Sequence, residues 1–134
     1  MTVTNDLFNL KNKTVVLTGS AGRVGTRFAH VLSDAGANVI LVDIDKSTNK
    51  KLEQELISQY KTKPSAFCVD ISKQKEVKQL VKKIISKYTK IDVLVNNAHF
   101  VPRTHSKRDA PFEEYPLALW DKTISINLRG LFLC

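Results

Sequence analysis

The sequence contains few of the features that mark several large classes of protein. Only two of its 134 residues are cysteines, Cys68 and Cys134, so neither a disulfide framework nor a cysteine-based metal site is expected. No stretch approaches ~18 consecutive apolar residues, which argues against a membrane-spanning helix. The first ten residues lack the basic-then-apolar order of a secretion signal. These absences predict a cytoplasmic protein with no metal site and no membrane partner.

Acidic residues are scarce relative to basic ones. The chain has 13 Asp and Glu residues against 21 Lys and Arg residues, which gives a formal net charge of +8. A nucleic-acid surface usually adds arginines and exposed aromatic residues. Here many of the positive charges are lysines on one predicted helix, namely Lys73, Lys75, Lys78, Lys82, Lys83, Lys87 and Lys90. We therefore expect a solvated helix face and no nucleic-acid partner.

What is present is the composition of one globular domain, with 43% hydrophobic and 25% charged residues. Strand patterns at 15–18, 38–43, 66–70 and 91–96 alternate with helical patterns. This alternation predicts right-handed crossovers and a parallel sheet. The expected fold class is α/β, a Rossmann-type doubly wound parallel sheet with helices on both faces, truncated after about four strands.

Apolar periodicity predicts a stripe along each helix. The first helix, ended by Gly36, carries Val24, Phe28, Val31, Leu32 and Ala35. The helix over 45–60 carries Leu52, Leu56 and Tyr60. A helix capped by Ser72 carries Val77, Leu80, Val81, Ile84, Ile85 and Tyr88. After a long loop from about 99 to 116, the last helix, over 120–134, carries Trp120, Ile124, Leu128 and Leu131.

The most informative segment is 13–25, where a short apolar strand runs into a glycine-rich turn. Gly19, Gly22 and Gly25 allow a tight turn and leave no side chain between the main chain and a pyrophosphate. The helix that begins around Arg23 would present free N–H groups and the positive end of its dipole to the phosphates. This arrangement predicts a dinucleotide site.

The second strand ends at Asp43, eighteen residues after Gly25. A carboxylate in this place can accept both hydroxyls of the adenosine ribose, and it repels a 2′-phosphate. We therefore expect NAD as the cofactor, with NADP disfavoured by Asp43. The simpler alternative is that Asp43 only caps the strand end, and Arg23 either leans over the pyrophosphate or points into solvent.

Four motifs in order resemble those of the short-chain dehydrogenase/reductase family, over nearly the whole chain. They are 18–25 (Thr-Gly-Ser-Ala-Gly-Arg-Val-Gly), 70–72 (Asp-Ile-Ser), 96–99 (Asn-Asn-Ala-His) and 126–130 (Ile-Asn-Leu-Arg-Gly). The resemblance implies that Asn127 is the family's helper Asn in catalysis. It implies cofactor contacts at Gly19, Ser20, Gly22, Arg23, Val24, Gly25, Asp43, Ile44, Asp70, Ile71, Asn97, Ala98 and His99.

The chain departs from the family pattern at several places. Arg23 stands where the common glycine motif has Gly. His99 replaces a Gly of the family motif, either as a tolerated loop residue or as a catalytic His. The family's proton-transfer pair is a Tyr with a Lys four residues later. Here the residues four places after Tyr60, Tyr88 and Tyr115 are Pro64, Asp92 and Leu119. The chain alone is therefore expected to be inactive.

The resemblance implies an NAD-dependent oxidoreductase that interconverts a secondary alcohol and a ketone on a small polar substrate. The basic loop with Arg103, His105, Lys107 and Arg108 either receives an anionic or sugar-like substrate or is merely a charged, solvated loop. The alternative function is a non-catalytic NAD-binding module or a truncated remnant.

The last helix has no stop signal, and the fourth strand would form an open edge. We expect residues 1–134 to be the N-terminal part of one NAD(P)-binding domain with no second domain. The full-length protein is expected to form a homodimer or homotetramer, as relatives do.

Overall fold

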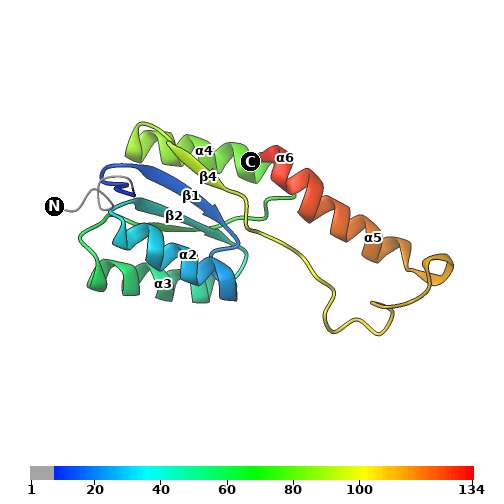
Figure 1. Ribbon diagram of the computed structural model, residues 1–134. Coiled ribbons are helices and arrows are strands. Elements are labelled where there is room, and N and C mark those ends of the chain that lie inside the picture. The colour runs from blue at the N-terminus through cyan, green and yellow to red at the C-terminus, as the bar shows by residue number, and fades with distance from the viewer. Residues whose placement is uncertain (1–7) are drawn as a thin grey trace.

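Four apolar segments form one parallel sheet in the computed structural model, which describes residues 8–134 (Figure 1). The strands are β1 (Thr14–Thr18), β2 (Asn38–Asp43), β3 (Ser65–Cys68) and β4 (Val93–Val95), in the order β3-β2-β1-β4. The start of the chain, predicted to lack a secretion signal, falls mostly in residues 1–7, outside the described residues. β3 ends two residues earlier than predicted, and β4 is shorter at both ends than predicted.

Helices cover both faces of this sheet (Figure 1). α2 (Arg23–Asp34) and α3 (Lys46–Gln59) pack on the face that carries Val15, Leu17, Val39 and Leu41. α4 (Gln74–Tyr88) packs on the opposite face, which carries Val16, Ile40 and Val42. Because β1 and β2 are covered on both sides, almost all of their residues are buried and both strands read as continuous apolar runs. The predicted fold class is confirmed.

The predicted inward stripe of α2 is wrong in part: Leu32 packs against the core as predicted, but the other large side chains of the stripe do not. Val24, Phe28 and Val31 are 51%, 43% and 67% exposed, and the buried residues are Gly25, Ala29 and Ser33. These small side chains let the helix lie close to the sheet and to the turn that precedes it. The helix does carry the apolar stripe that the periodicity predicts, but the face that is buried is the neighbouring one, which is lined by small residues.

The prediction for α4 is wrong at its N-terminus. Lys73 is the N-cap residue, and the Ser72 hydroxyl instead donates to Asp70 Oδ1 at 2.6 Å. Along the helix, Val77, Leu80 and Ile84 are buried as predicted, whereas Val81 and Ile85 lie at the exposed edge of the stripe. In α3 the prediction holds, with Leu52 and Leu56 buried, Tyr60 partly buried, and Asp45 as the N-cap.

The last segment is one helical rod with a change of period in the middle. α5 (Leu117–Ile124) begins three residues earlier than predicted and passes through a π-helical turn, η2 (Ser125–Gly130), into α6 (Leu131–Leu133). The predicted stripe of Trp120, Ile124, Leu128 and Leu131 is exposed. The residues packed against the sheet are instead Ile126, Leu133 and Cys134. The π turn interrupts the regular 3.6-residue period of this segment, and α5, which precedes the π turn, extends beyond the sheet.

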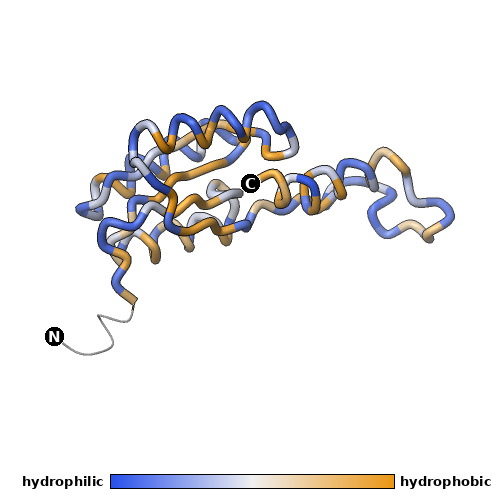
Figure 2. Tube along the Cα trace, turned by 90° about the horizontal axis from the view of Figure 1, so that it is seen from above, coloured by the Kyte–Doolittle hydropathy of each residue, from blue (hydrophilic) through white to orange (hydrophobic). Residues whose placement is uncertain are grey.

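The loop over 99–116, which contains the short 3₁₀ turn η1 (Phe112–Glu114), extends together with α5 beyond the sheet. We call residues 99–124 the arm. Figure 2 shows it projecting from the body, in which apolar strands lie between helices with hydrophilic outer faces. Across residues 8–134, no helix combines the length and apolar character that crossing a bilayer requires.

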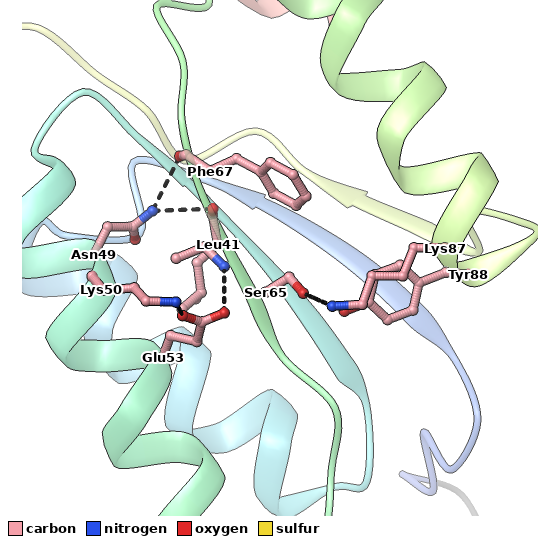
Figure 3. Close-up of polar contacts among 9 residues, drawn as sticks. Leu41, Asn49, Lys50, Glu53, Ser65, Phe67, Lys87 and Tyr88 are labelled. Atoms are coloured by element: carbon pink, nitrogen blue, oxygen red, sulfur yellow. Dashed lines mark hydrogen bonds and ion pairs between the residues drawn. The ribbon is translucent and has the colours of Figure 1, made fainter.

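Polar side chains tie the edge strand β3 to helices on both faces (Figure 3). Asn49 Nδ2 of α3 donates to the Leu41 and Phe67 carbonyls at 3.0 and 3.2 Å. The Glu53 carboxylate pairs with Lys50 and accepts from the Ala66 N–H at 3.1 Å. On the other side, Lys87 Nζ donates to Ser65 Oγ at 2.6 Å. These bonds hold a four-residue edge strand that has a sheet partner on one side only.

Candidate cofactor-binding site

The glycine turn lies at the carboxyl end of β1 and consists of closely packed backbone. Gly19 has φ +67°, and a Cβ there would lie 2.7 Å from Ala98 Cα. A Cβ on Gly25 would lie 2.0 Å from the Gly19 carbonyl oxygen. Both positions therefore require glycine. Gly22, Arg23 and Val24 follow as exposed residues at the start of α2. The Gly22 N–H donates to the Gly19 carbonyl at 3.2 Å, so the N–H groups of the first helical turn, from Arg23 on, are the ones left for an anion.

Thr18 connects this turn to the end of β4. Its hydroxyl oxygen accepts from the N–H groups of Asn97 and Ala98, both at 3.1 Å. The Asn97 side chain donates back to the Thr18 and Gly19 carbonyls at 3.0 and 3.1 Å. The predicted cofactor residues Asn97 and Ala98 thus hold the glycine turn in place. Sequence reasoning missed Thr18 as a site residue; its signal is a hydroxyl at the end of an otherwise apolar strand.

The Ser20 side chain points into the protein. It is fully buried, and its hydroxyl donates to Asn49 Oδ1 at 2.6 Å. Asn49, on α3, is 1% exposed and also bonds two strand carbonyls. Ser20 therefore anchors the turn through its side chain, and any cofactor contact must come from its backbone. Sequence reasoning also missed Asn49, which gave no local signal within a polar helix.

Asp43 joins the end of β2 to the glycine turn. Its Oδ2 accepts from the Ala21 N–H at 3.0 Å, and its Oδ1 accepts from the Asp45 N–H at 2.9 Å. The side chain is half-buried, and the following Ile44 is 71% exposed. A carboxylate and an exposed apolar side chain are thus adjacent beside the turn, and the cofactor contacts of Asp43 and Ile44 stay predictions.

Asp70 and Ile71 lie beyond β3, where their side chains have structural partners. Asp70 Oδ1 accepts from the Ser72 N–H at 3.0 Å and from its hydroxyl at 2.6 Å. Ile71 is buried against Gly130, where an added Cβ would meet Ile71 Cδ1 at 2.9 Å. The predicted adenine contacts of these two residues stay predictions.

The acid titration of Asp70 gives a testable expectation. Burial acts to raise the pKa of Asp70, but the Ser72 hydrogen bonds and the Lys73 charge outweigh it, so the pKa lies below its ordinary value. The resulting stabilisation is complete above the unfolded-state pKa and is lost as pH falls through the folded-state pKa. In urea unfolding from neutral to strongly acidic pH, we expect the stability difference between wild type and Asp70→Asn to shrink on acidification. A constant difference would contradict this assignment.

Asn127 lies in the π-helical turn η2 and fixes the start of the arm. Its Oδ1 accepts from the Phe100 N–H at 2.7 Å, and its Nδ2 donates to the Phe100 carbonyl at 3.0 Å. His99, immediately before Phe100, is exposed. π-helical turns within α-helices occur frequently at functional sites. The catalytic role of Asn127 stays a prediction; the structure gives its side chain a positioning contact.

The predicted site residues come together at one edge of the sheet, with Asp70 and Ile71 at its β3 end. The glycine turn follows β1, Asp43 closes β2, and Asn97 follows β4, with Asn127 bonded to the chain just beyond it. In open parallel sheets, ligands bind outside the carboxyl ends of the strands, where the strand order reverses. Within residues 8–134, no group of three or more His, Cys, Asp or Glu side chains could hold a metal ion.

Two solved structures share this fold. A metagenomic short-chain oxidoreductase in complex with NADP superposes with a TM-score of 0.81 at 24% identity, covering 92% of this chain and 53% of that chain. A 3-ketoacyl-(acyl-carrier-protein) reductase from Brucella melitensis complexed with NADH gives a TM-score of 0.78 at 29% identity, covering 93% and 48%. These two neighbours differ in their nucleotide.

Sequence comparison agrees with the fold. A curated relative, the NAD-dependent glycerol dehydrogenase of Listeria innocua, is 38% identical over 126 residues, which cover 94% of this chain and 46% of that protein. The chain thus spans about half the length of the first curated relatives it matches. The family model for short chain dehydrogenases matches residues 13–134. This chain belongs to the short-chain dehydrogenase family.

Proposed function

We propose that this chain forms the NAD-binding part of an oxidoreductase that interconverts a secondary alcohol and a ketone on a small polar substrate. The observation that carries the proposal is the Asp43 carboxylate, held at 3.0 Å from the Ala21 N–H within the glycine turn. The glycine turn and the Asp43 side chain bonded to it thereby form one unit. Its backbone can bind a pyrophosphate, and its carboxylate can bind a ribose.

Two positions of the turn require glycine because the neighbouring backbone packs directly against them. A Cβ at Gly19 or Gly25 would fall within 2.7 or 2.0 Å of backbone atoms. In this proposal the main-chain N–H groups of Arg23 and Val24 bind the pyrophosphate, and Asp43 binds the adenosine ribose. The cofactor accepts the hydride when the alcohol is oxidised and supplies it when the ketone is reduced. Asn127 keeps the segment after β4 in position by its two bonds to Phe100.

The preference for NAD rests on charge. A 2′-phosphate beside Asp43 would place two negative groups together, which costs binding energy. The Listeria innocua relative is NAD-dependent, the Brucella melitensis neighbour is complexed with NADH, and the metagenomic neighbour is complexed with NADP. The proposal extends to residues 1–134 as one N-terminal portion of a single cytoplasmic domain, in a protein that assembles as a homodimer or homotetramer.

The binding of reduced nucleotides to Asp43 variants tests the proposal. We expect Asp43→Ala to weaken NADH binding by about tenfold or more, because charge-assisted hydrogen bonds to the ribose are lost. NADPH binding is expected to stay the same or to improve. Fluorescence titration of both nucleotides measures the two effects, with Asp34→Ala, which removes the exposed charge at the far end of α2, as the control.

The two nucleotides separate recognition from structural damage. Loss of the bonds to Ala21 and Asp45 would weaken NADH and NADPH binding together, whereas loss of ribose recognition weakens only NADH binding. Unchanged NADH binding in Asp43→Ala, or no NADH binding by the wild type, would refute the proposed function.

A further inference from the structure

The arm contains an open pocket that the cofactor site does not use. It has a volume of about 530 Å³ and lies between the first residues of the arm loop and the start of α5. Val101, Pro102 and Leu119 contribute apolar wall, and the cationic side chains Arg103 and Lys122 line the same space. Among residues 8–134, no Asp or Glu lines this pocket.

The cations of the arm differ in how far they are neutralised. Lys107 Nζ lies 2.8 Å from Glu114 Oε2, and Arg108 Nη2 lies 2.8 Å from Asp109 Oδ2. Neither residue lines the pocket. In contrast, Arg103 and Lys122 have no carboxylate within 4.0 Å in the described part of the chain. The pocket thus concentrates the positive charge that the arm leaves uncompensated.

Local structure holds Lys122 at this pocket. Its Nζ lies 4.5 Å from the centre of the Phe100 ring, within the range of a cation–π contact. The Phe100 backbone is in turn fixed by both side-chain atoms of Asn127. The position of the Lys122 ammonium group therefore depends on Phe100, the residue through which Asn127 fixes the start of the arm.

The pocket is connected to that site along the chain. Phe100 lines the pocket and follows Ala98 by two residues, and Ala98 contacts the glycine turn through Thr18. The first turn of α5, on the pocket's other wall, has no acidic residue and no side-chain cap. Within residues 8–134, no carboxylate therefore competes with a ligand at this wall.

We propose that this pocket binds an anionic group of the substrate, a carboxylate or a phosphate, through Arg103 and Lys122. The guanidinium can make two parallel bonds to such a group, and the ammonium adds a point charge. Val101 and Leu119 contact the short aliphatic body of the same molecule. That the bound molecule is the substrate rests on the proposed function. The proposal assigns anion binding to Arg103 and Lys122 and not to Lys107 and Arg108, whose charges are neutralised by Glu114 and Asp109.

The test is a titration of the chain with three matched probes at constant ionic strength: glycerol 3-phosphate, glycerate and glycerol. Calorimetry measures binding. We expect at least one of the two anions to bind about tenfold or more tightly than glycerol. The tighter anion identifies the group as phosphate or carboxylate. Equal binding of all three probes would overturn the proposal.

Charge-matched variants identify the residues. We expect Arg103→Gln and Lys122→Gln each to weaken binding of the anion by about fivefold or more, and Lys107→Gln and Arg108→Gln to change it by less than about twofold. Each variant removes one positive charge from the same arm. Equal effects of all four would mean general electrostatic attraction and would overturn the proposal.

NADH binding by the same variants keeps the two ideas apart. Because the pocket cations lie outside the glycine turn, we expect all four variants to bind NADH like the wild type. Anion binding with this residue pattern in a chain that does not bind NADH would support the pocket and refute the proposed function. Intact NADH binding without selective anion binding would overturn only the pocket.

Discussion

The Gly25→Ala substitution is expected to destabilise the protein by about 3 kcal/mol or more and to abolish nucleotide binding. The added Cβ would lie 2.0 Å from the Gly19 carbonyl oxygen and 2.8 Å from Ser20 Cα. Both are backbone atoms of the turn, and no side-chain rotation can relieve the clash. The turn cannot move away, because Asn97 and Thr18 hold it against the end of β4.

Gly22→Ala is the matched control for this change. Gly22 is exposed, has an ordinary φ of −73°, and a Cβ there would lie 3.3 Å from the Gly19 carbonyl oxygen. A shift of a few tenths of an ångström accommodates that contact, so we expect a loss below about 1 kcal/mol. Urea unfolding followed by circular dichroism compares the two variants. Equal stabilities would mean that the close approach of α2 to the turn is not required.

The second large effect is expected for Asn49→Leu, which should cost about 3–5 kcal/mol of folding stability. Asn49 accepts from Ser20 Oγ and donates to the carbonyls of Leu41 and Phe67 (Figure 3). All three groups lose this partner when the amide is removed. Each buried polar group left without a bond costs about 1–3 kcal/mol.

The same helix provides a control for the change from a polar to an apolar side chain. Gln54→Leu alters an exposed position of α3, and we expect a change within about 0.5 kcal/mol. Thermal and urea unfolding measure both variants. A loss below about 1 kcal/mol in Asn49→Leu would show that the Asn49 bonds do not hold the turn, β2 and β3 together.

The candidate site was predictable where function depends on backbone and on short segments. The glycine turn has to follow a strand and leave space for a pyrophosphate, so its residues are consecutive and their spacing is visible in the sequence. Asp43 is recognisable for the same reason, since it closes the next strand. The long-range partners of the turn were not predictable in this way. Thr18 reaches Asn97 across 79 positions of sequence, and Ser20 reaches Asn49 across 29.

The sequence by itself determined the alternation of strands and helices, the parallel sheet and the place of the nucleotide site, because these follow from local periodicity and backbone freedom. Only the tertiary structure decided which helix faces are buried. In α2 the small residues Gly25, Ala29 and Ser33 are buried in place of Val24, Phe28 and Val31. In the last helix Ile126, Leu133 and Cys134 pack inward in place of the predicted stripe. Whether a helix face is buried depends on how closely the helix approaches the neighbouring element and on which residues of that element lie opposite. The spacing of apolar residues within the helix gives neither the distance nor the opposing residues.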